Sequence, residues 1–294
     1  MKKILLATTV LVGTAGFAAA EVTLSGDARM GIVDNGVDPV AFSSRARVTF
    51  SMSGETDGGL SFGASFRADN AGTNGTDGDG AANGRDGSVF ISGAFGKLSM
   101  GDVDGAAQMA TGHVAGVGYT GNGDLNESTF IAAGDADTDP TALYEYSTGA
   151  FTGYASVTNP GAGGDEAYAV GGKYSTDAFT VGLGYEDNGT ITHVVVKGSA
   201  TFSGVTVQAL YGQADLGATK EDQYAVSASY SMDALGITAF YTNDDDLGNT
   251  AGYAEAYGVG ASYDLGGGAS VAGGVSKNQT TDVTRYDLGV NFSF

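Results

Sequence analysis

Several residue types are scarce or absent in this chain, and each absence narrows the class of protein. There is no cysteine, so the fold must be stable without disulfides. Only 13 basic residues accompany 34 acidic ones, giving a net charge of −21. The sequence has no cluster of basic residues that could bind phosphates, which argues against a nucleic-acid-binding protein. The 50 glycines stand beside only three prolines and show no strict three-residue period, which excludes collagen.

The N-terminus has the pattern of an export signal. Lys2 and Lys3 precede a short apolar run, Ile4 to Val12, and Ala18 to Ala20 form a small-residue cleavage site. The run is shorter than the roughly 20 residues that a membrane-spanning helix needs. We therefore expect a cleaved signal peptide at residues 1–20 and a single mature domain at 21–294.

Apolar and polar residues alternate along most of the remaining chain. Ranges 22–32, 44–52, 60–69 and 286–294 carry the clearest pattern. Successive side chains of a β-strand point to opposite sides, so this period of two indicates strands with one apolar and one polar face. Weaker strands are predicted at 86–95, 97–103, 141–147, 150–158, 166–175, 178–187, 190–203, 204–214, 222–232, 236–243, 252–264 and 268–277.

Sixteen strands in all can be arranged in two ways. In a soluble sandwich the apolar faces would pack against each other. Here the polar faces carry four arginines, no helical segment is available to cover a sheet, and an open sheet of this length would expose unpaired edges. Tight turns also alternate with longer polar loops. These features favour an all-β, 16-stranded antiparallel transmembrane barrel with lipid outside and water inside.

One stretch, from about 102 to 141, lacks a convincing amphipathic strand. A loop of this length usually has a function. It contains no lysine or arginine; its acidic residues are Asp102, Asp104, Asp124, Glu127, Asp135, Asp137 and Asp139. One interpretation is a solvated external loop. The other is a loop that folds into the barrel and narrows it.

The placement of basic residues favours the second interpretation. The polar faces of the first strands carry Arg29, Arg45, Arg47 and Arg67, and Lys97 lies on the polar face of a later strand. Like charges clustered on one wall need opposing charge, which an acidic loop reaching across the lumen would supply. We therefore predict a constriction with these five residues as its basic side and the loop carboxylates as its acidic side.

The chain resembles a known family, the general diffusion porins of Gram-negative bacteria, and in particular those of purple non-sulfur photosynthetic bacteria. The resemblance covers the strands nearly throughout and is loose in the external loops. The segments that carry it are EVTLSGDARMGI at 21–32, SSRARVTFSMSGETDGGLSFGASFRA at 43–68, GAFGKLSMGD at 93–102, YDLGGGAS at 263–270 and the terminal NFSF.

The resemblance implies a homotrimer in the outer membrane, in contact with lipid and lipopolysaccharide, whose third loop folds inward to form an eyelet. It also implies that Phe294 is the aromatic end read by the barrel-assembly machinery. No cofactor is required. Some relatives bind calcium near the eyelet, so a calcium ion is a candidate ligand of the acidic loop, although no regular ligand spacing establishes it.

Two motifs that suggest enzymes are better explained by strands and glycine content. Gly59 to Gly63 spells G-x-S-x-G, but Ser61 lies within strand alternation and no helix follows. Gly116 to Gly121 spells G-x-G-x-x-G without the required strand and helix. No Cys/His cluster suggests a zinc site. We therefore expect a non-enzymatic protein.

Three functions are compared. The first is a water-filled pore for passive permeation of small hydrophilic solutes and ions, with a mild cation preference. The alternative is a substrate-selective channel on the same scaffold, which would show saturable flux. The third is an enzyme or adhesin anchored by the barrel, which would need an additional domain or a catalytic constellation, and the sequence contains neither. The first is the function that we expect.

Overall fold

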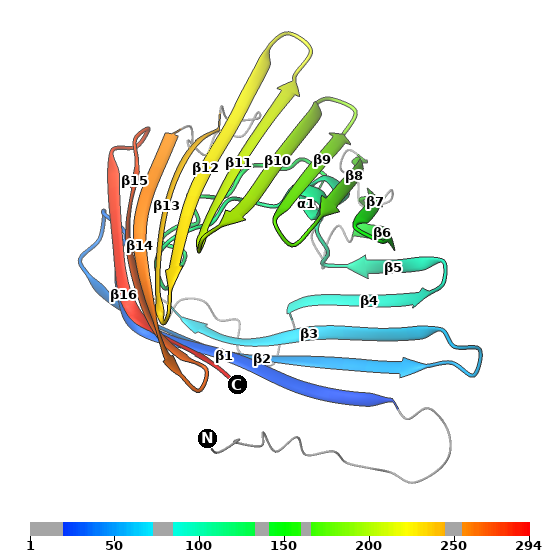
Figure 1. Cartoon of the computed structure of the whole chain (residues 1–294), viewed down its shortest axis with the longest axis horizontal. Coiled ribbons are helices and arrows are strands. Elements are labelled where there is room, and N and C mark those ends of the chain that lie inside the picture. Colours follow the sequence, from blue (N-terminus) through cyan, green and yellow to red (C-terminus); the bar gives the residue numbers. More distant parts are fainter. Residues whose placement is uncertain (1–19, 73–84, 133–140, 160–165, 245–254) are drawn as a thin grey trace.

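A closed barrel of sixteen antiparallel strands forms the molecule (Figure 1). The computed structural model describes residues 20–72, 85–132, 141–159, 166–244 and 255–294. Each strand pairs with its neighbours in the chain, and β1 closes the ring by pairing with β16, where Met30 lies opposite Val290. The predicted fold class is confirmed, and closure leaves the sheet without an edge.

The strands have the following bounds: β1 Glu21–Asp34, β2 Ala41–Glu55, β3 Ser61–Gly72, β4 Arg85–Gly93, β5 Gly96–Gly101, β6 Thr141–Thr148, β7 Phe151–Val157, β8 Tyr168–Ser175, β9 Phe179–Asp187, β10 Thr192–Phe202, β11 Val205–Asp215, β12 Lys220–Met232, β13 Leu235–Asp244, β14 Glu255–Gly266, β15 Ala269–Asn278 and β16 Val283–Ser293. All sixteen predicted strands are present. Their ends differ from the predicted ends in both directions: β1 and β2 are longer than predicted, whereas β7 and β10 are shorter.

The apolar faces point outward. Met30 of β1 and Leu288 of β16 are exposed on the outer surface. The residues that alternate with them along each strand point into the barrel. Water in the lumen solvates the inner polar face, and the outer apolar face suits hydrocarbon. Every strand obtains its backbone hydrogen bonds from two neighbours, as a lipid-exposed wall requires.

Aromatic side chains mark both ends of the outer surface. The ends joined by longer connections carry Tyr168, Tyr185, Tyr211, Tyr224, Tyr241, Tyr257 and Tyr286, and the ends joined by short turns carry Phe151, Tyr174, Phe179, Tyr230 and Tyr263. All are exposed except Tyr241, which is partly buried. Rings at these two levels match the aromatic girdles of transmembrane barrels, whose short turns face the periplasm.

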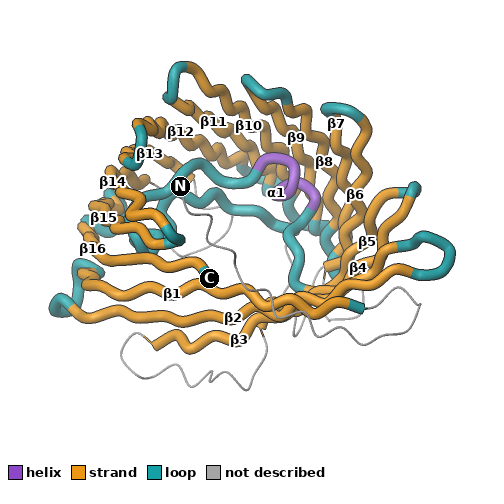
Figure 2. Tube along the Cα trace, turned by 60° about the horizontal axis from the view of Figure 1, so that its bottom comes forward, coloured by secondary structure: helices purple, strands orange, loops and turns teal. Residues whose placement is uncertain are grey.

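Residues 102–132, which follow β5, lie inside the barrel, along the wall formed by β7 to β16 (Figure 2). It includes one short helix, α1, at Ala106–Thr111, which the sequence analysis did not predict. A six-residue helix is too short to show a 3.6-residue pattern. No helix in the described ranges is long and apolar enough to cross a membrane.

The helix α1 is held by close contact with glycines of the wall. A Cβ atom on Gly182 would lie 2.1 Å from the carbonyl oxygen of Ala110, and one on Gly171 would lie 2.4 Å from that of Ala106. The Ala106 amide also donates to Ser156 Oγ of β7 at 2.8 Å. Glycine is therefore required at these wall positions because α1 occupies the volume that a side chain would need.

Wall side chains accept hydrogen bonds from the rest of the loop, which has little regular structure of its own. The Ala115 amide donates to Gln208 Oε1 at 2.8 Å, and the Thr120 amide donates to Asp287 Oδ2 at 2.8 Å. The Thr129 amide donates to Asp244 Oδ2 at 2.9 Å. Buried backbone groups need such partners, so these polar side chains fasten the loop.

The returning part of the loop is fastened by a buried network of three wall residues, Glu186 of β9, His193 of β10 and Gln223 of β12. Each has an exposed fraction of 1% or less. The Glu186 carboxylate accepts from the amides of Ile131 at 2.9 Å and Ala132 at 3.1 Å, and it lies 2.7 Å from His193 Nδ1.

The direction of the hydrogen bonds in this network follows from Gln223. Its Nε2 donates to the Thr129 carbonyl at 3.1 Å, so the same amide nitrogen donates to His193 Nε2 at 2.8 Å. The His193 proton is then on Nδ1, where it faces Glu186. The carboxylate therefore has three donors, and all three wall residues act together to hold the loop.

The network yields a prediction about loop attachment. Replacement of Glu186 by glutamine places an amide N–H against one of the three groups that donate to the carboxylate, and it removes a charge-assisted hydrogen bond. This should weaken the attachment of the loop by about 1.5–3 kcal/mol. Amide hydrogen exchange at Ile131 and Ala132 should accelerate roughly tenfold to a hundredfold. The matched control is Glu145→Gln, which removes the same charge from β6, where the carboxylate has no hydrogen bond to the described part of the loop. Equal exchange in E186Q and E145Q would contradict the prediction.

Candidate channel constriction

A cluster of arginines lies on the inner face of the first three strands. Within the β1–β2 hairpin, Arg29 is opposite Arg45, and Asp27 is opposite Arg47. Arg67 follows on β3, two residues before Asp69, which is opposite Arg47. All four guanidinium groups therefore lie on one side of the lumen because they occupy alternate positions of adjacent strands.

The arginines are paired first with carboxylates of the same wall. Arg45 binds Asp27 with a nitrogen–oxygen distance of 2.7 Å. Asp69, whose side chain is 7% exposed, bridges Arg47 at 3.1 Å and Arg67 at 2.6 Å. Asp27 and Asp69 are not among the acidic partners predicted from the sequence. Their positions in the predicted hairpins could have identified them, because each is directly or diagonally opposite an arginine on the polar face.

Arg29 makes the contact between this cluster and the loop. Its guanidinium donates to the carbonyl of Thr120 at 3.3 Å and lies 5.9 Å from the ring centroid of Tyr119. The Tyr119 ring packs against Gly31 and Gly289, where any Cβ atom would clash with it. The loop is therefore anchored beside the arginine wall as well as against β7 to β15.

The free edge of the loop is acidic. Asp104, Asp124 and Glu127 are exposed, whereas Leu125 between the last two is buried against the wall. Partial burial and the nearby carboxylates of Asp124 and Asp104 raise the pKa of Glu127. These three carboxylates thus form one electrostatically connected group, which we call the acidic edge.

The chain reaches this arrangement through a tight series of turns. Gly118, Gly121 and Gly123 all have φ near +87°, and Asp124 adopts φ of +53°. A Cβ on Gly121 would lie 2.0 Å from Asp124 Oδ1. The G-x-G-x-x-G pattern therefore serves backbone folding within the loop, as inferred from the sequence, because only glycine fits these turns.

Lys97 lies apart from the arginines. It borders a cavity of about 350 Å³ that is also lined by Asp102, Asp104 and Glu145. Its Nζ lies 4.8 Å from the ring centroid of Phe90. The structure thus places this predicted basic residue among carboxylates of the loop and of β6, and it does not bring Lys97 into the arginine cluster.

The remaining predicted acidic residues, Asp135, Asp137 and Asp139, lie outside the described residues. Within the described part of the chain, no three Asp, Glu, His or Cys side chains are grouped so that they could hold a metal ion. The donor set for calcium is therefore not found here, and calcium binding stays a prediction from the resemblance. No step of the function below depends on it.

The second enzyme-like motif also falls in the barrel wall. Ser61 is the first residue of β3, where it pairs with Glu55 and Ser92. His113 and His193 lie instead at the loop and at its attachment to β10. Gly59 and Leu60 lie in the turn before β3, and Ser61 to Gly63 begin the strand, so the motif lacks the strand-to-helix turn of a nucleophile elbow.

Comparison with known proteins agrees with this architecture. Residues 7–283 match the family model described as Gram-negative porin. A porin of Rhodobacter capsulatus is 39% identical over 312 residues, covering 93% of this chain and all of that protein. A porin of Fuscovulum blasticum is 28% identical with the same coverage.

Solved structures give the same result. A porin structure refined at 1.8 Å resolution matches with a TM-score of 0.78 and 36% identity, covering 93% of this chain and all of that one. A mutant of the porin of Rh. blastica has the same fold, with a TM-score of 0.73 at 22% identity and the same coverage. With its closed sixteen-stranded barrel and inward-folded loop, this chain belongs to the Gram-negative porins, a family of outer-membrane channels.

Proposed function

We propose that this porin is a general diffusion channel whose narrowest part lies between the acidic edge of the loop and the arginine cluster of β1 to β3. The observation that carries the proposal is the position of the loop, which lies inside the barrel with Asp104, Asp124 and Glu127 on its unattached edge. Both charge groups are solvated, so hydrated solutes pass between surfaces of opposite sign.

Charge of both signs around the passage suits a channel of low specificity. A dipolar solute orients in the transverse field, and no single solute gains a dedicated set of partners. Asp27 and Asp69 compensate part of the arginine charge, whereas no salt bridge among the described residues joins a carboxylate of the acidic edge to an arginine. The proposal therefore includes a mild cation preference.

The assembly that we propose is a homotrimer, as the resemblance implies. The continuous apolar outer surface supports contacts with lipid, with lipopolysaccharide and with two further copies of the chain. The protein moves solutes down their gradients and performs no bond chemistry.

The first prediction concerns conduction itself. Purified protein added to planar lipid bilayers should produce stepwise current increases that are linear with voltage, because the passage is permanently filled with water. The measurement is single-channel conductance in KCl, with heat-unfolded protein as the control. Electrically silent bilayers, obtained with protein that is shown to be folded, would refute the channel function.

The second prediction concerns the arginine cluster. Replacing Arg45 and Arg47 by alanine should widen the passage and raise the K⁺ to Cl⁻ permeability ratio roughly two- to fourfold. The estimate follows because a unit charge about 5 Å away changes the energy of an ion by somewhat under 1 kcal/mol in water. The barrel should still fold, since Asp69 keeps Arg67 and Asp27 is partly solvated.

The matched control removes the same charge outside the lumen. Lys220 and Lys277 pair with Asp215 and Asp282 near the long-loop end of the barrel. The variant K220A/K277A should keep the wild-type permeability ratio, measured from reversal potentials. An unchanged ratio in R45A/R47A, or loss of its folded barrel, would make the arginines structural residues.

The third prediction uses pH. Because its pKa is raised by partial burial and by Asp124 and Asp104, Glu127 binds a proton at a higher pH than an ordinary glutamate. As the pH falls through this raised value, the acidic edge loses one negative charge and the cation preference decreases. The variant E127Q should lack this step and show the reduced preference already at neutral pH. A pH profile identical to the wild type would exclude Glu127 from the constriction.

A further inference from the structure

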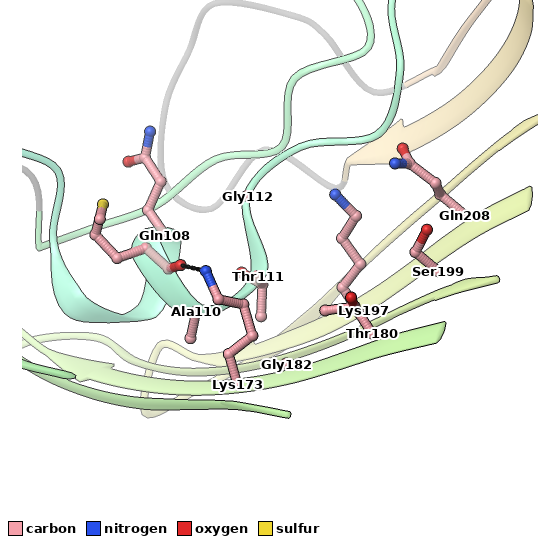
Figure 3. Close-up of a pocket in the computed structure, with 11 residues that line it drawn as sticks. Gln108, Ala110, Thr111, Gly112, Lys173, Thr180, Gly182, Lys197, Ser199 and Gln208 are labelled. Carbon is pink, nitrogen blue, oxygen red and sulfur yellow. Dashed lines mark hydrogen bonds between the residues drawn. The ribbon is translucent and has the colours of Figure 1, made fainter. Parts of the chain in front are cut away.

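A second basic group lies on β8 and β10, next to the end of α1 (Figure 3). Lys173 of β8 and Lys197 of β10 point into a cavity of about 360 Å³ between the end of α1 and the wall. Polar wall residues Thr180, Ser199 and Gln208 also line the cavity. Neither lysine belongs to the basic group that the sequence predicts.

These lysines differ from the arginines in what surrounds them. Lys173 Nζ donates to the Met109 carbonyl at 3.5 Å, and Lys197 Nζ donates to the His113 carbonyl. Among the described residues neither lysine forms a salt bridge, whereas Arg45, Arg47 and Arg67 each have a carboxylate. A neutral carbonyl uses one N–H of each ammonium and leaves its charge uncompensated.

The other groups in the cavity supply further donors. Gln208 Oε1 is occupied as an acceptor from the Ala115 amide and from Ser227 Oγ, so its Nε2 is the group left for a ligand. The Ser199 hydroxyl lies beside it on the neighbouring strand, in register. Two ammonium groups, an amide N–H and a hydroxyl therefore converge on one water-accessible space, which is the donor set for an anion with several oxygens.

The position of the cavity relates it to the path of solutes. Along β9, the lining residues Thr180 and Gly182 lie nearer to the short turn than Gly184, against which Ala107 of α1 packs. Short turns face the periplasm in this class of barrel. The cavity thus lies on the periplasmic side of the helix.

From this geometry we infer a binding subsite for small oxyanions, of the phosphate or carboxylate class, at Lys173 and Lys197. The inference rests on the proposed channel function and deepens it: an anionic solute that passes the loop is held briefly between two lysines before release. Chloride lacks the several oxygen acceptors that would use the donors of Ser199 and Gln208, so the subsite favours oxyanions over chloride.

The experiment measures binding directly, and therefore does not depend on conduction. Folded, detergent-solubilised protein is titrated with inorganic phosphate at constant ionic strength in chloride, and the ³¹P line width of phosphate is followed. The wild type should show saturable broadening. In K173Q/K197Q the half-saturation concentration should rise at least about tenfold, since two charge-assisted contacts are lost.

Two further variants distinguish binding at this specific site from nonspecific attraction by the positive charge of the barrel. K173R/K197R keeps both positive charges and should retain saturable binding within about threefold of the wild type. K220Q removes a lysine near the long-loop end and should leave phosphate binding unchanged. Because glutamine still donates to a carbonyl, α1 should stay attached in K173Q/K197Q, which hydrogen exchange at the amides of Met109 and Gly112 verifies.

The outcomes decide the inference. Broadening that does not saturate, that persists in K173Q/K197Q, or that falls equally in K220Q would overturn the subsite. Acetate in place of phosphate, followed by ¹³C line width, tests whether carboxylates share it. Channel conductance recorded in parallel keeps the two claims separate, because silent bilayers would refute the proposed function while saturable phosphate binding stood.

Discussion

The fastening of an irregular loop to the inside of the barrel is the interaction on which the site depends. Most of residues 102–132 form neither helix nor strand, so their amides need other partners. Wall carboxylates and amides supply them: Glu186 binds two consecutive amides, Asp287 binds Thr120, and Gln208 binds Ala115. An unpaired buried amide costs about 1–3 kcal/mol, so these contacts determine where the acidic edge lies.

This requirement changes the meaning of the acidic composition. The excess of acidic over basic residues suggests at first a uniformly negative lumen. Glu186 and Asp287 are instead almost fully buried and accept hydrogen bonds from backbone amides. Asp69 forms salt bridges with two arginines. The carboxylates of the acidic edge that face water are a small subset, selected by the path of the loop.

The barrel was predictable from sequence because alternation with a period of two is a local property. The sixteen strands, the long loop and its inward position follow from that pattern and from the arginines. The mode of attachment was not predictable in the same way. His193 and Gln223 look like ordinary polar-face residues, and only the register of β9, β10 and β12 brings them together with Glu186.

The helix α1 shows the same limit. AAQMAT has helix-forming residues, but six residues are too few for a stable helix without tertiary contacts. Its contacts are Gly171, Gly182 and Gly184, which the sequence presents as unremarkable members of a glycine-rich chain. The information that determines α1 therefore lies on β7, β8 and β9, which follow it at a distance in the sequence.

The charge groups of the lumen can be ordered by how each is compensated. Arg45, Arg47 and Arg67 are paired with carboxylates of their own wall, which fixes their positions and reduces their net field. Lys173 and Lys197 are held by loop carbonyls, which fix the ammonium groups without neutralising them. The same loop thus presents carboxylates at its free edge and orients two uncompensated cations at its attached edge. In the proposed channel a passing ion would meet both, and loop attachment is the common cause of each.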